Sequence, residues 1–275
     1  MPFFDAHMHF WDREILKPYI WMHEVPTIWH RHTFANLPEE TDELPDKAVF
    51  IEAGAPWREE LQWVEQLAVT EPRIAALVPR LIVNAGGQTT ADIAELRRHP
   101  LVRGVRHHFE HDPFDYCSRP EFIAGVRQLA SAGLTFDICC RPGQLPAVID
   151  LVRACPEVTF ILDHAGKAPI RDRQIDPWRS QMSTLAAYPN LVCKFSGLAV
   201  AGSAEWTISD LRPWVAHLLD TFTPSRLLFG GDWPICKLAT SYTRWLQTVR
   251  ELTAALSASE RKAIFQQNAA RIYRL

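Results

Sequence analysis

Phe3-Phe4-Asp5-Ala6-His7-Met8-His9-Phe10 opens the chain with an apolar run that carries two histidines. In a β-strand, residues two positions apart point to the same face. The imidazoles of His7 and His9 would therefore project together from the C-terminal end of this strand. The stretch predicts a strand that delivers a pair of metal ligands.

Two later apolar runs also end in polar side chains. Residues 158–164 (Val-Thr-Phe-Ile-Leu-Asp-His) close on His164, and residues 226–232 (Arg-Leu-Leu-Phe-Gly-Gly-Asp) close on Asp232. An aspartate in an apolar setting costs free energy unless it is paired or binds a metal. Together with the first two histidines, these residues form the set typical of a mononuclear divalent-metal hydrolase. A structural hydrogen-bonded pair of His164 with the preceding aspartate is an equal alternative.

Short apolar runs with the character of buried strands recur eight times along the chain. Segments with apolar residues at three-to-four spacing lie between them and are typical of helices. Strand and helix alternating eight times in a chain of this length predict a (β/α)8 TIM barrel. The expected strands are residues 3–10, 47–53, 74–83, 101–109, 134–141, 158–164, 191–197 and 226–232, and the expected helices are residues 58–70, 90–98, 119–132, 145–155, 178–188 and 208–222.

The remaining segments fit a single domain. Ser257 and Glu260 form a capping box that predicts a C-terminal helix over residues 259–274, which we expect to cover the outside of the barrel. Residues 11–45 show little periodicity and predict a long first loop that forms a lid and part of the pocket wall. No linker or internal repeat marks a second domain, so we expect one domain over residues 1–275. A doubly wound open sheet is the alternative, but Gly-x-Gly-x-x-Gly and Walker loops are absent from the sequence.

The composition narrows the classes of partner. The formal net charge of -3 gives no electrostatic reason to expect nucleic acid or an anionic membrane as a partner. The six cysteines are dispersed through apolar runs, and the sequence shows no secretory signal pattern. We therefore expect reduced thiols in a cytoplasmic protein. The oligomeric state stays open, a homo-oligomer included.

Polar residues gather at the C-terminal ends of the expected strands. In a barrel these ends face one another across one mouth, where catalysis takes place. His107 and His108 are adjacent, so one of them should point into the helix layer, and the sequence does not decide which. Arg141 and Lys194 suit either a salt bridge or a substrate contact. The residues expected around the mouth are His7, His9, Arg106, His108, Arg141, His164, Lys194 and Asp232.

With these residues in place, the chain resembles the amidohydrolase superfamily. Within it, the chain is similar to the branch that holds L-fuconolactonase, L-rhamnonolactonase and 2-pyrone-4,6-dicarboxylate lactonase. Several of the matching motifs are loose individually, but together and in this order they are specific to the family. They are residues 5–11, 104–107, 162–167, 193–198, 228–234 and 268–273.

The resemblance implies a distorted (β/α)8 barrel that hydrolyses a small lactone. Strand 4 carries Arg106, His107 and His108 where dinuclear members have a bridging carboxylated lysine, so we expect one divalent ion, best matched by zinc. A metal-free site is the alternative, with Arg106 and the histidines polarising the carbonyl. The implied metal ligands are His7, His9, His164 and Asp232, and the implied catalytic residues are Asp232 as general base and His164.

The substrate side is less defined. Trp11 and Trp233 are candidates for stacking on a sugar ring. The further expected substrate contacts are Arg106, His107, His108, Arg141 and Lys194. A sugar-acid lactone is the first expectation. The alternatives are a pyrone dicarboxylate, a metal-dependent decarboxylation, and a barrel that binds a sugar acid without catalysis.

Overall fold

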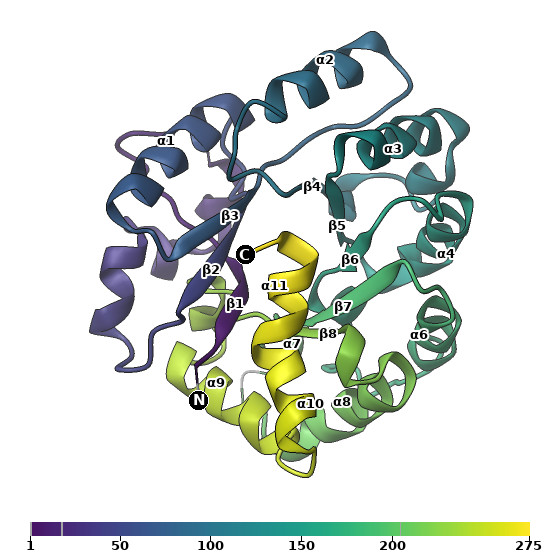
Figure 1. Cartoon of the computed structure of the whole chain (residues 1–275). Coiled ribbons are helices and arrows are strands. Elements are labelled where there is room, and N and C mark those ends of the chain that lie inside the picture. The colour runs from purple at the N-terminus through teal and green to yellow at the C-terminus, as the bar shows by residue number, and fades with distance from the viewer. Residues whose placement is uncertain (1, 18, 204) are drawn as a thin grey trace.

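In the part of the chain that the structure describes, eight parallel strands form the wall of a barrel with helices outside them (Figure 1). The computed structural model describes residues 2–17, 19–203 and 205–275. The strands are β1 (Phe4–Met8), β2 (Lys47–Ile51), β3 (Ile74–Val78), β4 (Gly104–His108), β5 (Thr135–Cys139), β6 (Phe160–Leu162), β7 (Leu191–Phe195) and β8 (Leu227–Phe229).

The strands form two sheets that close into one ring. One sheet has the order β1-β2-β3 and the other β4-β5-β6-β7-β8. Isolated bridges from Met8 to Trp233 and from Arg80 to Arg106 join the sheets on both sides. The predicted (β/α)8 barrel is therefore confirmed, and its irregular seams lie where these bridges replace a continuous ladder.

Helices follow the strands close to the predicted positions. The strands are shorter than predicted: β1 ends at Met8, and Trp11 pairs with His32 of the first loop. Within the described ranges, no helix has both the length and the apolar character that crossing a membrane requires. The helices are α1 (Trp57–Thr70), α2 (Gly87–Leu96), α3 (Pro120–Ala132), α4 (Leu145–Ala154), α5 (His164–Lys167), α6 (Trp178–Ala186), α7 (Leu198–Ala201), α8 (Ile208–Phe222), α9 (Tyr242–Leu252), α10 (Ala258–Lys262) and α11 (Asn268–Tyr273).

The interior of the barrel has an apolar part and a charged part. Alternate strand positions point inward, and many of them carry apolar side chains. Charged side chains are also buried there: Asp137 in the middle of β5, Lys194 near the end of β7 and Asp163 just after β6 are fully buried. The chain therefore places charge in its own core next to the mouth. The apolar interior residues are Ala6, Val49, Ile51, Ala76, Val78, Ile161, Val192 and Leu228.

The C-terminal helix closes one end of the barrel. The prediction that it covers the outside is wrong: α11 lies across the strand ring (Figure 1). Asn268 donates to the carbonyl of Leu227 at the start of β8, and Arg274 donates to that of Gly133 just before β5. Tyr273 packs into the apolar interior. An apolar helix face thus covers the end where the strands begin.

The first loop is a packed segment built around three short 3₁₀ helices, Ile20–Glu24, Pro26–Ile28 and Phe34–Glu39. Trp21 donates its indole N–H to the carbonyl of Ala53, just beyond β2. Pro18, which belongs to the same predicted loop, lies outside the described residues. The described part of the loop thus rests on the C-terminal side of the barrel, and its role as a lid stays a prediction.

Candidate active site

His7 and His9 meet at the mouth end of β1. Nδ1 of His9 lies 2.9 and 3.0 Å from the carbonyl oxygens of Ile51 and Glu52, so it carries the proton and leaves Nε2 with a free lone pair. Nδ1 of His7 lies 3.3 Å from Oδ1 of Asp163, which favours the same tautomer. The two Nε2 atoms are 3.2 Å apart. Two lone pairs at this distance repel unless a proton or a cation is shared between them.

Asp232 joins this pair from the loop after β8. Its Oδ1 lies 3.6 Å from Nε2 of His7 and 3.4 Å from Nε2 of His9, and no described residue makes a well-formed hydrogen bond to it. Burial alone would raise the pKa of this carboxyl, but His164, His9 and His7 outweigh burial and hold the pKa below its usual value. Asp232 is therefore an ionised carboxylate with one oxygen open to a ligand.

These three donors fit a divalent metal ion. His7, His9 and Asp232 each offer one ligand atom, and these atoms lie within 4.8 Å of one another. A tetrahedral ion with bonds of about 2.1 Å holds neighbouring ligand atoms about 3.4 Å apart. Burial lowers the pKa of His7, which keeps its imidazole in the neutral form that binds metal. Imidazole nitrogen and carboxylate oxygen are ligands that suit zinc.

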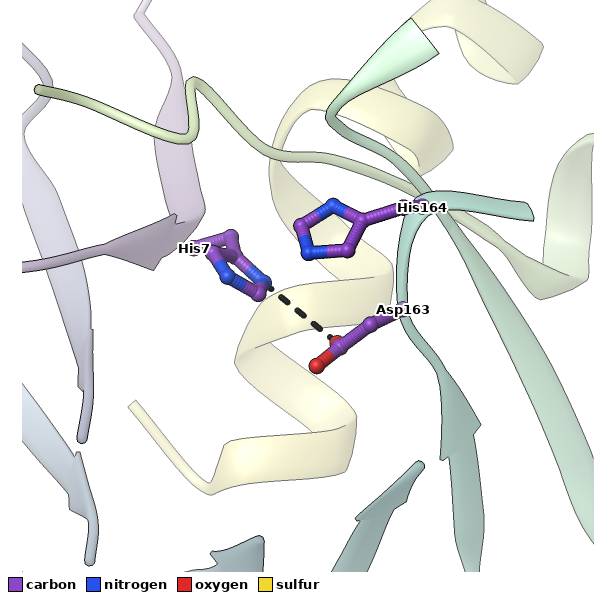
Figure 2. Close-up of side chains that lie close together, drawn as sticks. All are labelled: His7, Asp163 and His164. Carbon is purple, nitrogen blue, oxygen red and sulfur yellow. Dashed lines mark ion pairs between the residues drawn. The ribbon is translucent and has the colours of Figure 1, made fainter. Parts of the chain in front are cut away.

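His164 stands beside this centre at the end of β6. Figure 2 shows its ring next to that of His7, with Asp163 paired to His7, and the two ring centroids are 4.6 Å apart. Nδ1 of His164 lies 2.9 Å from Oγ of Ser196 and 3.9 Å from Oδ2 of Asp232. Burial lowers the pKa of His164. A neutral imidazole therefore borders the second oxygen of the carboxylate.

The four predicted ligands are thus brought together, but not as one donor set. His164 groups with His7 and Asp163, whereas His9 groups with His7 and Asp232. The site is nearly closed to solvent, with exposed fractions of 0% for His7, 6% for His9 and 3% for Asp232. The arrangement separates a group of three donors, His7, His9 and Asp232, from the neighbouring imidazole of His164.

The backbone is strained at two of these residues. His164 (φ 55°) and Asp232 (φ 56°) adopt the left-handed conformation, which costs about 1–3 kcal/mol for a residue other than glycine. Ala165 and Lys167 share it, with φ of 50° and 51°. Such strain persists only where surrounding structure holds it, and it clusters at functional sites. The backbone strain therefore supports a functional site here, independently of the distances between the donor atoms.

The orientation of β4 shows which of the adjacent residues His107 and His108 faces the barrel interior. Nε2 of His107 lies 2.7 Å from Oδ2 of Asp112, and its ring stacks on Tyr116 in the helix layer. Its predicted substrate contact is wrong, because alternate strand residues face opposite sides. Arg106 and His108 share the inner side, and burial lowers the pKa of His108 to about 2. Of the two inward-facing residues, Arg106 is the charged one and His108 the neutral one.

The two predicted stacking residues are core residues. Trp11 and Trp233 are fully buried, with the ring of His32 edge-on to both, at 5.3 and 5.2 Å. Their indole N–H groups donate to the carbonyl of His30 and to Glu40. Neither ring has exposed surface for a sugar to stack on, so this prediction is wrong for the structure described. These large rings instead fill the space under the first loop.

Lys194 and Arg141 differ in accessibility. Lys194 is fully buried, and its Nζ makes ion pairs with Asp137 and Asp163, so it has no surface to offer a substrate. Arg141 stays half-buried at the end of β5, with Nη2 donating to the carbonyl of Asp112. Of these two residues, substrate contact therefore stays a prediction for Arg141.

Several site residues escaped the sequence analysis. Asp137, Ser196 and Glu110 were not singled out, yet they pair with Lys194, His164 and Lys167. A lone carboxylate within the apolar run Thr135-Phe136-Asp137-Ile138-Cys139 was a usable signal for the first of them. The other two carried no pattern in the sequence, because their partners are distant along the chain.

Known proteins match this chain over nearly its whole length. A family model described as Amidohydrolase matches residues 4–275. An L-fucono-1,5-lactonase from Burkholderia multivorans is 34% identical over 98% of this chain and 95% of its own, and one from Burkholderia ambifaria is 28% identical over the same shares. A Burkholderia multivorans amidohydrolase solved with bound zinc is 31% identical, with a TM-score of 0.89 and both chains fully covered. The chain therefore belongs to the amidohydrolase family.

Proposed function

We propose that this protein opens the ester bond of a small sugar-acid lactone, with Asp232 as general base. The observation that carries the proposal is the convergence of His7, His9 and Asp232 beside His164 at the barrel mouth. Two relatives of similar length that are named L-fucono-1,5-lactonase support this reaction class. Lactone hydrolysis needs an activated water, a polarised carbonyl and a proton for the leaving alkoxide.

The metal ligands in this proposal are His7, His9 and Asp232, and the ion is zinc. When bound there, the ion supplies a Lewis acid that polarises the lactone carbonyl. His164 is assigned to proton handling rather than to the metal, because the donor group of His7, His9 and Asp232 does not include it. The zinc found in the related amidohydrolase structure supports this choice of ion.

Asp232 moves the proton in this mechanism. Its Oδ2, which borders His164 at 3.9 Å, takes a proton from water as the water oxygen bonds to the carbonyl carbon. The ring C–O bond then breaks, and Asp232 returns the proton to the departing alkoxide. The product is an open-chain hydroxy acid. His164 lies close enough to orient the water and to stabilise the carboxylate in both steps.

The charges around the mouth favour a neutral lactone over a dicarboxylate. Arg106 is held by Asp163 at 3.3 Å and by Glu52 at 3.7 Å. Lys167 is paired with Glu110. Of the cations around the mouth, Arg106, Lys167 and the buried Lys194 already have carboxylate partners. Cations that are already paired in this way are not available to the two carboxylates of a dicarboxylate substrate.

A substrate panel tests this proposal. Purified protein should hydrolyse neutral sugar-acid lactones, followed by acid release with a pH indicator, with L-fucono-1,5-lactone in the panel. A carboxylate left without its cation costs a few kcal/mol, so 2-pyrone-4,6-dicarboxylate should have a kcat/KM lower by about 100-fold. The reverse preference, or decarboxylation of an aromatic acid in place of hydrolysis, would contradict the proposal.

Gly197 provides a second test of the site, through His164. A Cβ atom at Gly197 would lie 2.6 Å from Nδ1 of His164. Gly197→Ala should therefore displace this imidazole and lower kcat, by up to about 10²-fold for a shift near 1 Å. Gly133→Ala is the matched control, because Gly133 has nearly the same φ (66° against 65°) and its nearest neighbour, Arg274, would be 3.7 Å away.

Both alanine variants carry a similar backbone cost of about 1–2 kcal/mol, which thermal melting measures. Only Gly197→Ala should also lose activity. Equal activity in the two variants would show that the close approach of Gly197 to His164 does not matter for catalysis.

The setting of the enzyme is part of the proposal. Six unpaired, buried cysteines support work in the reducing cytoplasm. The amidohydrolase match over residues 4–275 supports one catalytic domain across the chain. The proposed partner is the small-molecule lactone itself.

A further inference from the structure

Beneath the candidate metal centre, the ammonium group of Lys194 lies in a cage formed by Asp137, Asp163 and His7. Its Nζ is 2.6 Å from Oδ2 of Asp137, 2.9 Å from Oδ1 of Asp163 and 3.3 Å from Nδ1 of His7. All four side chains are fully buried. Two carboxylate oxygens around one point would suit a divalent cation, whereas Nδ1 of His7, which carries its proton, is a neighbour of this position and not a ligand. Here a side-chain cation occupies that position.

The C-terminal helix holds this cage from the other side. The hydroxyl of Tyr273, on α11, donates to Oδ2 of Asp137 at 2.7 Å, the same oxygen that receives Lys194. Tyr273 is fully buried. Figure 2 shows the C-terminal helix running past the side chains of the site, and Figure 1 shows that this helix lies across the ring of strands. A residue near the end of the chain thus reaches the charged layer of the barrel.

Asp163 connects Lys194 to the candidate metal centre. Its Oδ1 is shared between Lys194 and Nδ1 of His7, at 2.9 and 3.3 Å, and its Oδ2 lies 3.3 Å from Nε of Arg106. Two cations therefore hold the carboxylate from different directions. A carboxylate fixed in this way receives the Nδ1 proton of His7 and turns Nε2 of that ring toward His9.

We propose that Lys194 is a positioning residue, a built-in cation that takes the place of a second metal ion. Held by Asp137 and Tyr273, it fixes Asp163 and thereby orients His7 as a metal ligand. The inference rests on the proposed function only in requiring that a divalent ion binds His7 and His9. It assigns a role to a fully buried lysine that sequence analysis had offered as a substrate contact.

Zinc affinity of the full-length protein tests the proposal without any measurement of activity. Metal-free protein is titrated with Zn²⁺ against a chromophoric chelator, and the visible spectrum of the Co²⁺ form reports the ligand geometry. Loss of an outer contact to a metal-binding histidine typically weakens metal affinity by about 10–100-fold, so Lys194→Met should weaken zinc binding to this extent and change the Co²⁺ spectrum. Tyr273→Phe should weaken zinc binding by less, about threefold or more.

Two further variants keep the test decisive. Lys194→Met leaves two buried carboxylates short of a cation and is liable to unfold, so Lys194→Met/Asp137→Asn removes one charge of each sign. This double variant should fold and still bind zinc weakly. Tyr116→Phe is the matched control, because Tyr116 packs against His107 in the helix layer, and it should leave zinc affinity unchanged.

The outcomes separate this inference from the proposed function. Wild-type zinc affinity and an unchanged Co²⁺ spectrum in the folded double variant and in Tyr273→Phe would overturn the inference. A wild-type protein that takes up no zinc would overturn it as well, while lactone hydrolysis by that protein would leave the function standing. Tight zinc binding without lactone hydrolysis would contradict the function alone.

Discussion

Asp232→Asn is expected to lower kcat for lactone hydrolysis by roughly three orders of magnitude, within the 10²–10⁴-fold range of a general acid or base. The amide cannot accept the proton that the low-pKa carboxylate of Asp232 takes from water. Because this interaction forms in the transition state, KM should change much less than kcat. Initial rates over a range of lactone concentrations measure both quantities.

Two other effects of the same substitution would imitate this result. Asp232 is also a proposed metal ligand, and its buried position contributes to the packing of the mouth. Zinc content and thermal melting, measured on the same preparation, separate these effects from loss of the base. Asp172→Asn, at an exposed position, controls for the change of charge. If the variant keeps near wild-type rates with zinc and stability intact, His164 becomes the candidate base.

The central residues of the site could be predicted from the sequence because strand geometry is local. Alternation along β1 puts His7 and His9 on one side, and the apolar runs before His164 and Asp232 mark where β6 and β8 end. In a barrel, these ends converge by topology alone. Four residues spread over more than two hundred positions could therefore be assigned to one site without any contact information.

The surroundings of these residues could not be predicted, because they depend on contacts between distant segments. The register of β4, which turns His107 outward, is fixed by pairing with β5. The burial of Trp11 depends on how the first loop folds back, through its pairing with His32. Periodicity indicated that residues 259–274 are helical, but it contained no information on whether the apolar face of that helix covers the outside or the end of the barrel.

The charged layer inside the barrel limits how the site can polarise a carbonyl. Arg106 was the sequence-based candidate for this role in a metal-free site. In the structure it is 4% exposed and shared between Asp163 and Glu52. A guanidinium engaged by two carboxylates has less positive charge to offer a substrate oxygen. A divalent ion held by the proposed ligands would therefore be the stronger electrophile.

Removal of the divalent ion is accordingly expected to reduce lactone hydrolysis by at least about 100-fold, since Lewis-acid polarisation contributes several kcal/mol. Dialysis against a chelator followed by addition of one equivalent of Zn²⁺ should abolish and then restore the activity. The ion binds the folded state, so its removal should also lower the melting temperature. Melting curves with and without Zn²⁺ measure this linkage.

His9→Gln tests whether the zinc-dependent activity and the zinc-dependent rise in melting temperature both arise at this site. Nε2 of His9 is a donor to the proposed ion, and its Nδ1 is held by the carbonyls of Ile51 and Glu52. The variant should lose both the zinc-dependent activity and the zinc-dependent rise in melting temperature. Chelated wild-type protein that retains full activity would reject the metal centre, and the histidines together with Arg106 would then have to polarise the carbonyl despite the carboxylates that hold Arg106.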